Sequence, residues 1–131
     1  MKELFAVFLG GGLGSVVRFI ISMLWRHVSL HPRYAGMVFP WPTFIANILG
    51  CLLIGFFYQY SERWGLSSET RLLLTTGFCG GFTTFSTFSY ESATLLRSGL
   101  YSTFALYIAA SLILGIIVVI IPSVISTHTV I

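Results

Sequence analysis

Four long apolar stretches, separated by short polar segments, constrain this chain more than any other feature of its sequence. They run over residues 4–24, 43–60, 71–97 and 100–121. A helix needs about 20 apolar residues to cross the hydrocarbon core of a bilayer, so each stretch is long enough to cross once. The sequence therefore predicts an all-α integral membrane protein, with four transmembrane helices in a single domain over residues 1–131.

The composition agrees with this class. Of 131 residues, 56% are hydrophobic and 8% are charged, whereas a soluble domain carries about 25% charged residues. Cys51 and Cys79 both fall inside apolar stretches, so we expect them to be packing residues. No His, Asp and Cys residues gather on facing stretches, so an enzyme is not expected. We predict a multi-pass protein of the cell membrane.

The basic residues are balanced between the two predicted sides of the membrane. Four crossings put the N-terminus, the second loop and the C-terminus on one side. That side carries three basic residues and so does the other: Lys2, Arg63 and Arg71 against Arg26, Arg33 and Arg97. Orientation normally follows an excess of Lys and Arg on the cytoplasmic side. A balanced count allows insertion both ways and an antiparallel homodimer, but chance also balances the count in small proteins.

The third stretch is unusual for a membrane helix. Its interior holds Gly77, Gly80 and Gly81, each of which costs a helix about 1 kcal/mol relative to Ala, and five Thr and two Ser lie between positions 75 and 89. In lipid, irregular backbone is tolerated only inside protein or beside a water-filled cavity. We predict a helix broken near residues 77–83, at mid-membrane. The alternative is a kinked helix whose hydroxyls bond to its own preceding turn.

Two phenylalanines follow this region. Phe85 and Phe88 are three residues apart and so share one face of a helix. On spacing alone, simple packing is the more economical interpretation. The edge of an aromatic ring is electropositive, however, so the rings offer a second possibility, which is contact with an anion.

Several hydrogen-bond donors lie within the apolar stretches. Asn47, one turn after Thr43, must face protein or water, because an unpaired amide in hydrocarbon costs several kcal/mol. Its amide therefore donates either to an anion or to a neighbouring helix. Tyr107 and Ser111 are four residues apart and share a face of the fourth stretch. A track of hydroxyls would be completed by Thr83, Thr84, Ser86 and Thr87.

Two charged residues also fall within the predicted spans. Arg18 lies about three-quarters of the way along the first stretch, and Glu91 lies towards the end of the third. Charges inside a membrane span are functional candidates by default. We favour a structural role for Arg18, and the sequence leaves the role of Glu91 open.

Together these features favour a pore for a small, hard anion. Such an ion enters a low-dielectric medium only where other groups replace its water. Hydroxyl and amide donors can do so, because each hydrogen bond to a charged partner contributes about 1.5–3 kcal/mol. The interiors of the third and fourth stretches hold no Lys or Arg. Conduction requires binding weak enough for exit, so this absence fits a channel.

The motifs themselves resemble those of the Fluc (CrcB-type) fluoride channel family. The resemblance covers the whole chain, and the long motif in the third stretch is the most specific part. Only Pro42 departs from the family pattern, where Gly often stands. The motifs are TGFCGGFTTFSTFSYE over residues 76–91, Gly14-x-x-x-Arg18, Trp41-Pro42-Thr43-x-x-x-Asn47 and Tyr107-x-x-x-Ser111.

The resemblance implies a passive, fluoride-selective channel formed by an antiparallel, dual-topology homodimer with two pores. A structural, non-transported Na⁺ would be held by the main-chain carbonyls of Gly80 and Thr83 from both subunits. Arg18 would be a structural charge near the vestibule. The fluoride pore would be lined by Phe85, Phe88, Asn47, Thr43, Thr84, Ser86, Tyr107 and Ser111, with Phe85 and Phe88 contacting the ion.

Two other functions are alternatives to this one. A small multidrug-resistance-type exporter also has four helices and dual topology, but it needs an acid deep in a pore-lining helix. The first stretch holds Arg18 instead, and Glu91 is near an end of its stretch. A purely structural membrane subunit would have no use for the costly polar run in the third stretch.

Overall fold

The computed structural model describes residues 1–30, 36 and 38–128, and every regular element in those ranges is a helix. The all-α prediction is confirmed. In chain order the elements are α1 (Lys2–Ser29), α2 (Trp41–Tyr60), α3 (Ser68–Leu72), the π-helical segment η1 (Leu73–Cys79), α4 (Gly80–Phe82), α5 (Phe85–Arg97) and α6 (Tyr101–His128).

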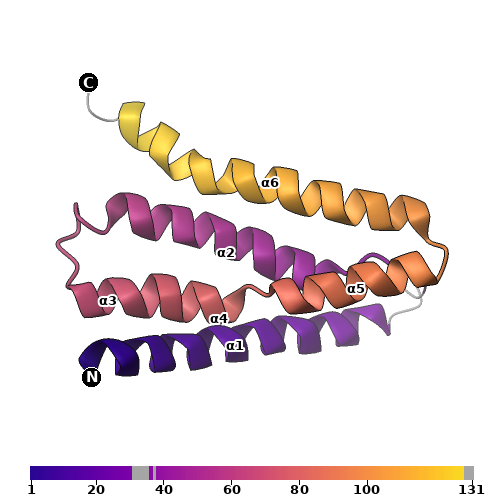
Figure 1. The fold of residues 1–131 in the computed structure, drawn as a ribbon, viewed down its shortest axis with the longest axis horizontal. Coiled ribbons are helices and arrows are strands. Elements are labelled where there is room, and N and C mark those ends of the chain that lie inside the picture. Colours follow the sequence, from indigo (N-terminus) through magenta and orange to yellow (C-terminus); the bar gives the residue numbers. More distant parts are fainter. Residues whose placement is uncertain (31–35, 37, 129–131) are drawn as a thin grey trace.

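The helices form four roughly parallel rows that alternate in direction (Figure 1). Three rows are the single helices α1, α2 and α6, each long and apolar enough to cross a membrane. The fourth row consists of α3, η1, α4 and α5 in succession. The N-terminus, the α2–α3 connection and the end of α6 lie at one end of the molecule, as the four-crossing prediction requires. Arg33, one of the six balanced charges, lies outside the described residues.

The helix boundaries follow from local chemistry. Pro42 stands in the first turn of α2, where the N–H that it lacks would have no helical partner. Ser67 caps α3, because its hydroxyl accepts a hydrogen bond from the Thr70 amide at 3.2 Å. Gly99, with φ of +73°, makes the turn between α5 and α6, and this conformation favours glycine.

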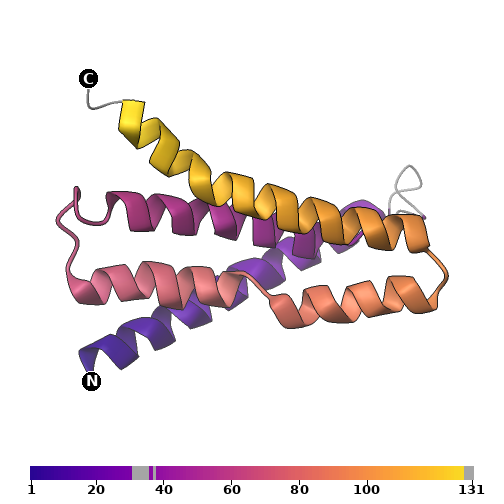
Figure 2. The same ribbon diagram turned by 45° about the horizontal axis from the view of Figure 1, so that its top comes forward.

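Helix α6 extends beyond the end predicted at Ile121 and contains Pro122 in its interior. Proline removes one helical hydrogen bond and bends the helix, and α6 curves over its last turns (Figure 2). The Ser123 hydroxyl donates to the Ile120 carbonyl at 2.7 Å. Pro122 itself removes the helical donor of the Val118 carbonyl, four residues earlier, and membrane helices tolerate such a proline through local adjustment of the backbone.

Helix α1 packs against η1 and α4 along glycines. A side chain at Gly10 would meet the Leu73 carbonyl, and one at Gly14 would meet the Phe78 carbonyl. From the other side, a side chain at Gly81 would meet the backbone of Gly11. Gly10 and Gly14 are four residues apart, a GxxxG pair of the kind that lets membrane helices approach closely. We call this contact the glycine seam.

The fourth row loses its helical conformation at two threonines. Thr83 (φ −82°, ψ 158°) and Thr84 (φ −151°, ψ 117°) are extended, and a short linker separates α4 from α5 (Figure 2). The glycines at 77, 80 and 81, from which the sequence predicts a break near 77–83, remain helical. Two of them serve the glycine seam, where a helix needs small residues to approach closely. The irregular backbone follows them.

Candidate functional site

One side chain of α2 holds the extended backbone between α4 and α5. The Thr84 amide donates to Asn47 Oδ1 at 2.8 Å, and Asn47 Nδ2 donates to the Thr84 carbonyl at 3.2 Å. Both backbone groups of Thr84 are therefore paired outside any helix, as backbone in an apolar environment requires. The predicted alternative for Asn47, a bond to a neighbouring helix, is what the structure has. An amide nitrogen has two hydrogens, so one donor remains for another partner.

Thr84 is also the N-cap residue of α5. Its hydroxyl accepts a hydrogen bond from the Thr87 amide at 3.3 Å and donates to the Thr87 hydroxyl at 3.1 Å. The first amides of a helix carry a partial positive charge and favour anions. Because the break lies partway along the fourth row, the 13-residue helix α5 begins midway along the molecule rather than at one of its ends (Figure 1).

The carbonyl end of α4 is held from α1. Arg18 Nε donates to the Gly81 carbonyl at 3.2 Å, and the Ser15 hydroxyl donates to the same oxygen at 3.3 Å. These bonds replace the helical donor that is lost where the chain becomes extended. They support the structural role expected for Arg18. Sequence reasoning missed Ser15, although its position three residues before Arg18 places both on one helix face.

The predicted pore residues partly surround a groove of about 580 Å³. None of its described lining residues is charged. Five of the eight predicted pore residues line it, as do both residues predicted to bind Na⁺. The lining consists of Asn47, Gly50, Cys51, Ile54, Tyr58, Thr75, Thr76, Cys79, Gly80, Thr83, Thr84, Phe85, Phe88, Ser111 and Leu112.

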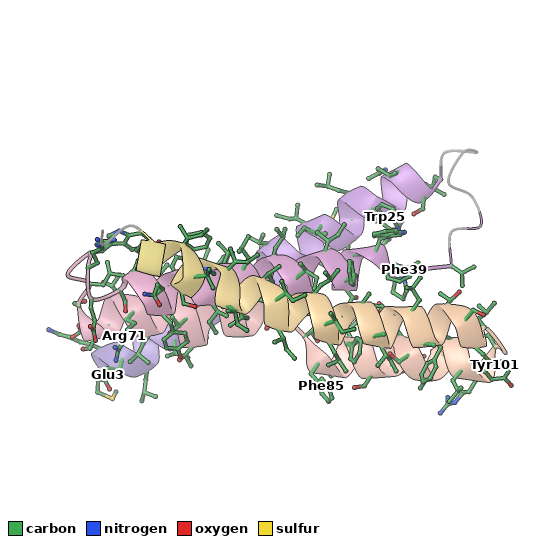
Figure 3. The ribbon with its side chains drawn as sticks, turned by 90° about the horizontal axis from the view of Figure 1, so that it is seen from above. Glu3, Trp25, Phe39, Arg71, Phe85 and Tyr101 are labelled. Atoms are coloured by element: carbon green, nitrogen blue, oxygen red, sulfur yellow. The ribbon has the colours of Figure 1, made fainter. Side chains whose placement is uncertain are left out.

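The two phenylalanines lie at the α5 end of this groove. The ring centroids of Phe85 and Phe88 are 6.0 Å apart and the rings are tilted by 38°, within the range for an interacting aromatic pair. Phe85 is 78% exposed, and Figure 3 shows it at the edge of the bundle. Ser111 lines the same groove, and its buried hydroxyl has no partner among the described residues.

Thr43 and Tyr107 meet outside the groove, at Glu91. The Thr43 hydroxyl donates to one carboxylate oxygen and the Tyr107 hydroxyl to the other, both at 2.8 Å. The Tyr107 side chain is fully buried, and its ring centroid lies 5.0 Å from that of Phe88. Glu91, whose role the sequence left open, thus joins α2, α5 and α6 beside the groove. A partly buried carboxylate beside apolar helices needs such donors.

Ser86 is the predicted pore residue with the weakest link to the groove. It is exposed and shares a hydrogen bond with the Thr84 hydroxyl at 3.3 Å.

Cys51 and Cys79 are free thiols in the groove wall, in agreement with their prediction as packing residues.

A family model described as "CrcB-like protein, Camphor Resistance (CrcB)" matches residues 5–122. The chain belongs to this family. The match spans the groove, the glycine seam and the Glu91 cluster. Curated relatives of the chain are named as ion channels rather than exporters, so the multidrug-resistance alternative is not supported.

Curated CrcB relatives resemble the chain over most of its length. The protein named fluoride-specific ion channel FluC from Phocaeicola vulgatus is 52% identical over 117 residues, or 89% of this chain and 92% of the relative. The one from Bacteroides fragilis is 49% identical over 121 residues, 91% of each chain. The one from Flavobacterium psychrophilum is 44% identical over 117 residues, 88% of this chain and 90% of the relative.

Proposed function

We propose that the protein is a fluoride-selective channel, through which F⁻ leaves the cytoplasm passively, down its gradient. The names of its relatives support the identity of the ion. The observation in this chain that carries the proposal is the uncharged groove, in which the Phe85–Phe88 ring pair lies beside the amide of Asn47 and the start of α5.

Each feature of the groove answers a requirement of anion conduction. The first amides of α5 and the free hydrogen of the Asn47 amide offer partial positive charge to an ion that has shed water. Ring edges of Phe85 and Phe88 add weak electropositive contacts. Because no lining residue among those described carries a full charge, the ion is bound weakly enough to leave.

We further propose that two copies associate in antiparallel orientation to form two pores. In one protomer the groove is open, and Phe85, Thr76 and Gly80 along it are exposed. A second copy that covers this face would convert each open groove into an enclosed path. Dual topology is supported by the basic residues at both ends, with Arg63 between α2 and α3 and Arg97 in the last turn of α5.

The residues predicted to hold a structural Na⁺ fit such an ion. In a continuous helix the Gly80 carbonyl would accept from the Thr84 amide, but that amide donates to Asn47. Thr83 is extended, so its carbonyl also leaves the helical pattern. Unwound carbonyls of this kind coordinate Na⁺ in other membrane proteins. When bound between two protomers, the ion would join their two breaks without being transported.

Ion efflux from proteoliposomes tests the channel, with fluoride compared against chloride and a potassium ionophore to clamp the voltage. We expect rapid fluoride efflux without chloride efflux from the wild type. Phe85→Ile and Phe88→Ile should each slow fluoride efflux by about tenfold, the equivalent of one lost contact of about 1.4 kcal/mol. Phe19→Ile, on an exposed face of α1, is the matched control. Wild-type liposomes that release no fluoride would refute the channel, and full flux in both groove variants would refute the ring contacts.

Gly80→Val tests association and Na⁺ separately from folding. A Cβ atom at Gly80 meets no atom within 4 Å in the protomer, so the protomer should fold, while the dimer and its dependence on Na⁺ should be lost. Gly12→Val, also without neighbours within 4 Å, should leave both intact. Molar mass by light scattering in Na⁺ and in a large organic cation is the measurement. Assembly independent of Na⁺ would rule out the ion.

A further inference from the structure

We infer that Phe39, just before α2, is a positioning residue of the conduction path: its ring holds Tyr107 in place against Phe88 and Glu91. The inference rests on the proposed channel function for its effect on flux, but not for the contact itself. Phe39 lies outside the motifs described above. Its position beside α6 follows from the fold and not from the sequence (Figure 3).

The backbone around Phe39 is fixed by a tight turn. The Trp41 amide donates to the Phe39 carbonyl at 2.8 Å, and Pro40 between them has φ −76° and ψ 67°. These values define an inverse γ-turn, and proline already restricts φ to this region. The direction in which Phe39 leaves α2 is therefore set before any side chain packs.

The turn brings the Phe39 ring against Tyr107. The two ring centroids are 5.3 Å apart with an interplanar angle of 80°, an edge-to-face arrangement that aromatic pairs favour. Phe39 is held there by Trp41, at 4.7 Å, and by Phe44, at 5.3 Å. Its ring is thus fixed on the α2 side and in contact with α6 on the other.

Tyr107 is constrained at three points. Its ring contacts Phe39, its ring also contacts Phe88 at 5.0 Å, and its hydroxyl donates to Glu91 at 2.8 Å. The hydroxyl fixes one end of the side chain, but rotation about the ring axis is limited only by packing. Loss of the Phe39 ring would leave space on one face of Tyr107, because a protein interior does not close such a gap completely.

The Phe39–Tyr107 contact affects the groove because Tyr107 in turn contacts a groove residue. Tyr107 packs on Phe88, and Phe88 pairs with Phe85 at 6.0 Å. A contact through a ring edge depends on the orientation of the ring. If Tyr107 can turn, Phe88 is no longer held at one angle, and fluoride passage should slow without any change in the groove lining itself.

Phe39→Leu tests this, with Phe19→Leu as the matched control. Phe19 lies on an exposed face of α1, away from the rings that hold Phe39 and Tyr107. We expect Phe39→Leu to slow fluoride efflux about three- to tenfold, which corresponds to the usual strength of one aromatic pair. Phe19→Leu should change efflux less than about twofold. Phe39→Tyr keeps the ring and should restore efflux.

A second measurement reports on Tyr107 directly. With 3-fluorotyrosine at position 107, the ¹⁹F resonance should shift and broaden in Phe39→Leu but not in Phe19→Leu. Equal efflux in the two leucine variants, or an unchanged ¹⁹F resonance in Phe39→Leu, would overturn the inference. A wild type that passes no fluoride would refute the channel instead, and the ¹⁹F comparison would still decide whether Phe39 positions Tyr107.

Discussion

The broken fourth row presents two different sides to the rest of the molecule. Towards α1 it presents Gly77 and Gly81, whose backbones touch the backbone of α1 almost directly. Towards α2 it presents Thr83 and Thr84, with Asn47 hydrogen-bonded to the extended chain. The first side is stabilised by close packing and the second by hydrogen bonds.

The side that faces α1 makes the fourth row rigid, and the side that faces α2 carries the candidate functional site. A seam of glycines in lipid gains van der Waals contact and tolerates almost no change in volume. A polar break in lipid is costly unless every group is paired, so it persists only where neighbours pair it. In this chain Arg18 and Ser15, from the seam side, also donate to the Gly81 carbonyl at the break. The rigid side therefore holds the functional side in place.

Gly14→Val should have the largest effect. The new side chain would strike the Phe78 carbonyl and the Phe82 amide, and backbone cannot move aside as a side chain can. We expect a loss of more than about 3 kcal/mol in the free energy of unfolding, seen as little folded protein in detergent.

Gly12→Val is the control for this seam variant. It lies on the same helix, and a Cβ atom there meets nothing within 4 Å, so the midpoint of thermal unfolding should stay close to that of the wild type. If both variants were equally stable, the glycines would not form a tight seam.

Asn47→Leu should have the next largest effect. It keeps the volume of the side chain but leaves the amide and carbonyl of Thr84 without partners, at about 1–3 kcal/mol for each unsatisfied group. Thermal unfolding and fluoride efflux should fall together, because the break that forms the groove is no longer held.

Thr83→Val is the matched change on the same break. It removes one hydroxyl, whose one bond within the described residues goes to the Cys79 carbonyl of the preceding turn at 2.9 Å. We expect a loss of less than about 1 kcal/mol. A larger loss than in Asn47→Leu would mean that hydroxyls of the row itself, rather than α2, hold the break.

The four rows and the glycine contact of α1 could be predicted from the sequence, because both depend on properties that are local in the chain. Hydropathy over about 20 residues fixes the number of crossings, and small residues four apart, such as Gly10 and Gly14, mark a helix contact. The motif resemblance added the residues of the groove, which spacing alone left ambiguous for Phe85 and Phe88.

The position of the break could be predicted only in part, because within the predicted range 77–83 the extended residue is Thr83, at its end. Glycine lowers helix propensity, so the sequence alone favours a break at Gly77, Gly80 and Gly81 themselves. Tertiary contact reversed this: α1 keeps Gly77 and Gly81 helical, and Asn47, 37 residues from Thr84 along the chain, stabilises the extended backbone after them. The junction of Thr43 and Tyr107 at Glu91 is equally non-local, since it joins three helices.

The smallest effects should come from the two donors that hold the Gly81 carbonyl. Ser15→Ala and Arg18→Met each remove one hydrogen bond, at 3.3 and 3.2 Å, and each should cost about 1 kcal/mol, since the other donor still satisfies the oxygen. The double variant leaves the carbonyl unpaired and should cost more than the sum of the single changes. Thermal unfolding of all four proteins measures this coupling. Simple additivity would mean that Ser15 and Arg18 are not coupled through the Gly81 carbonyl, and this link between the seam and the break would then be absent.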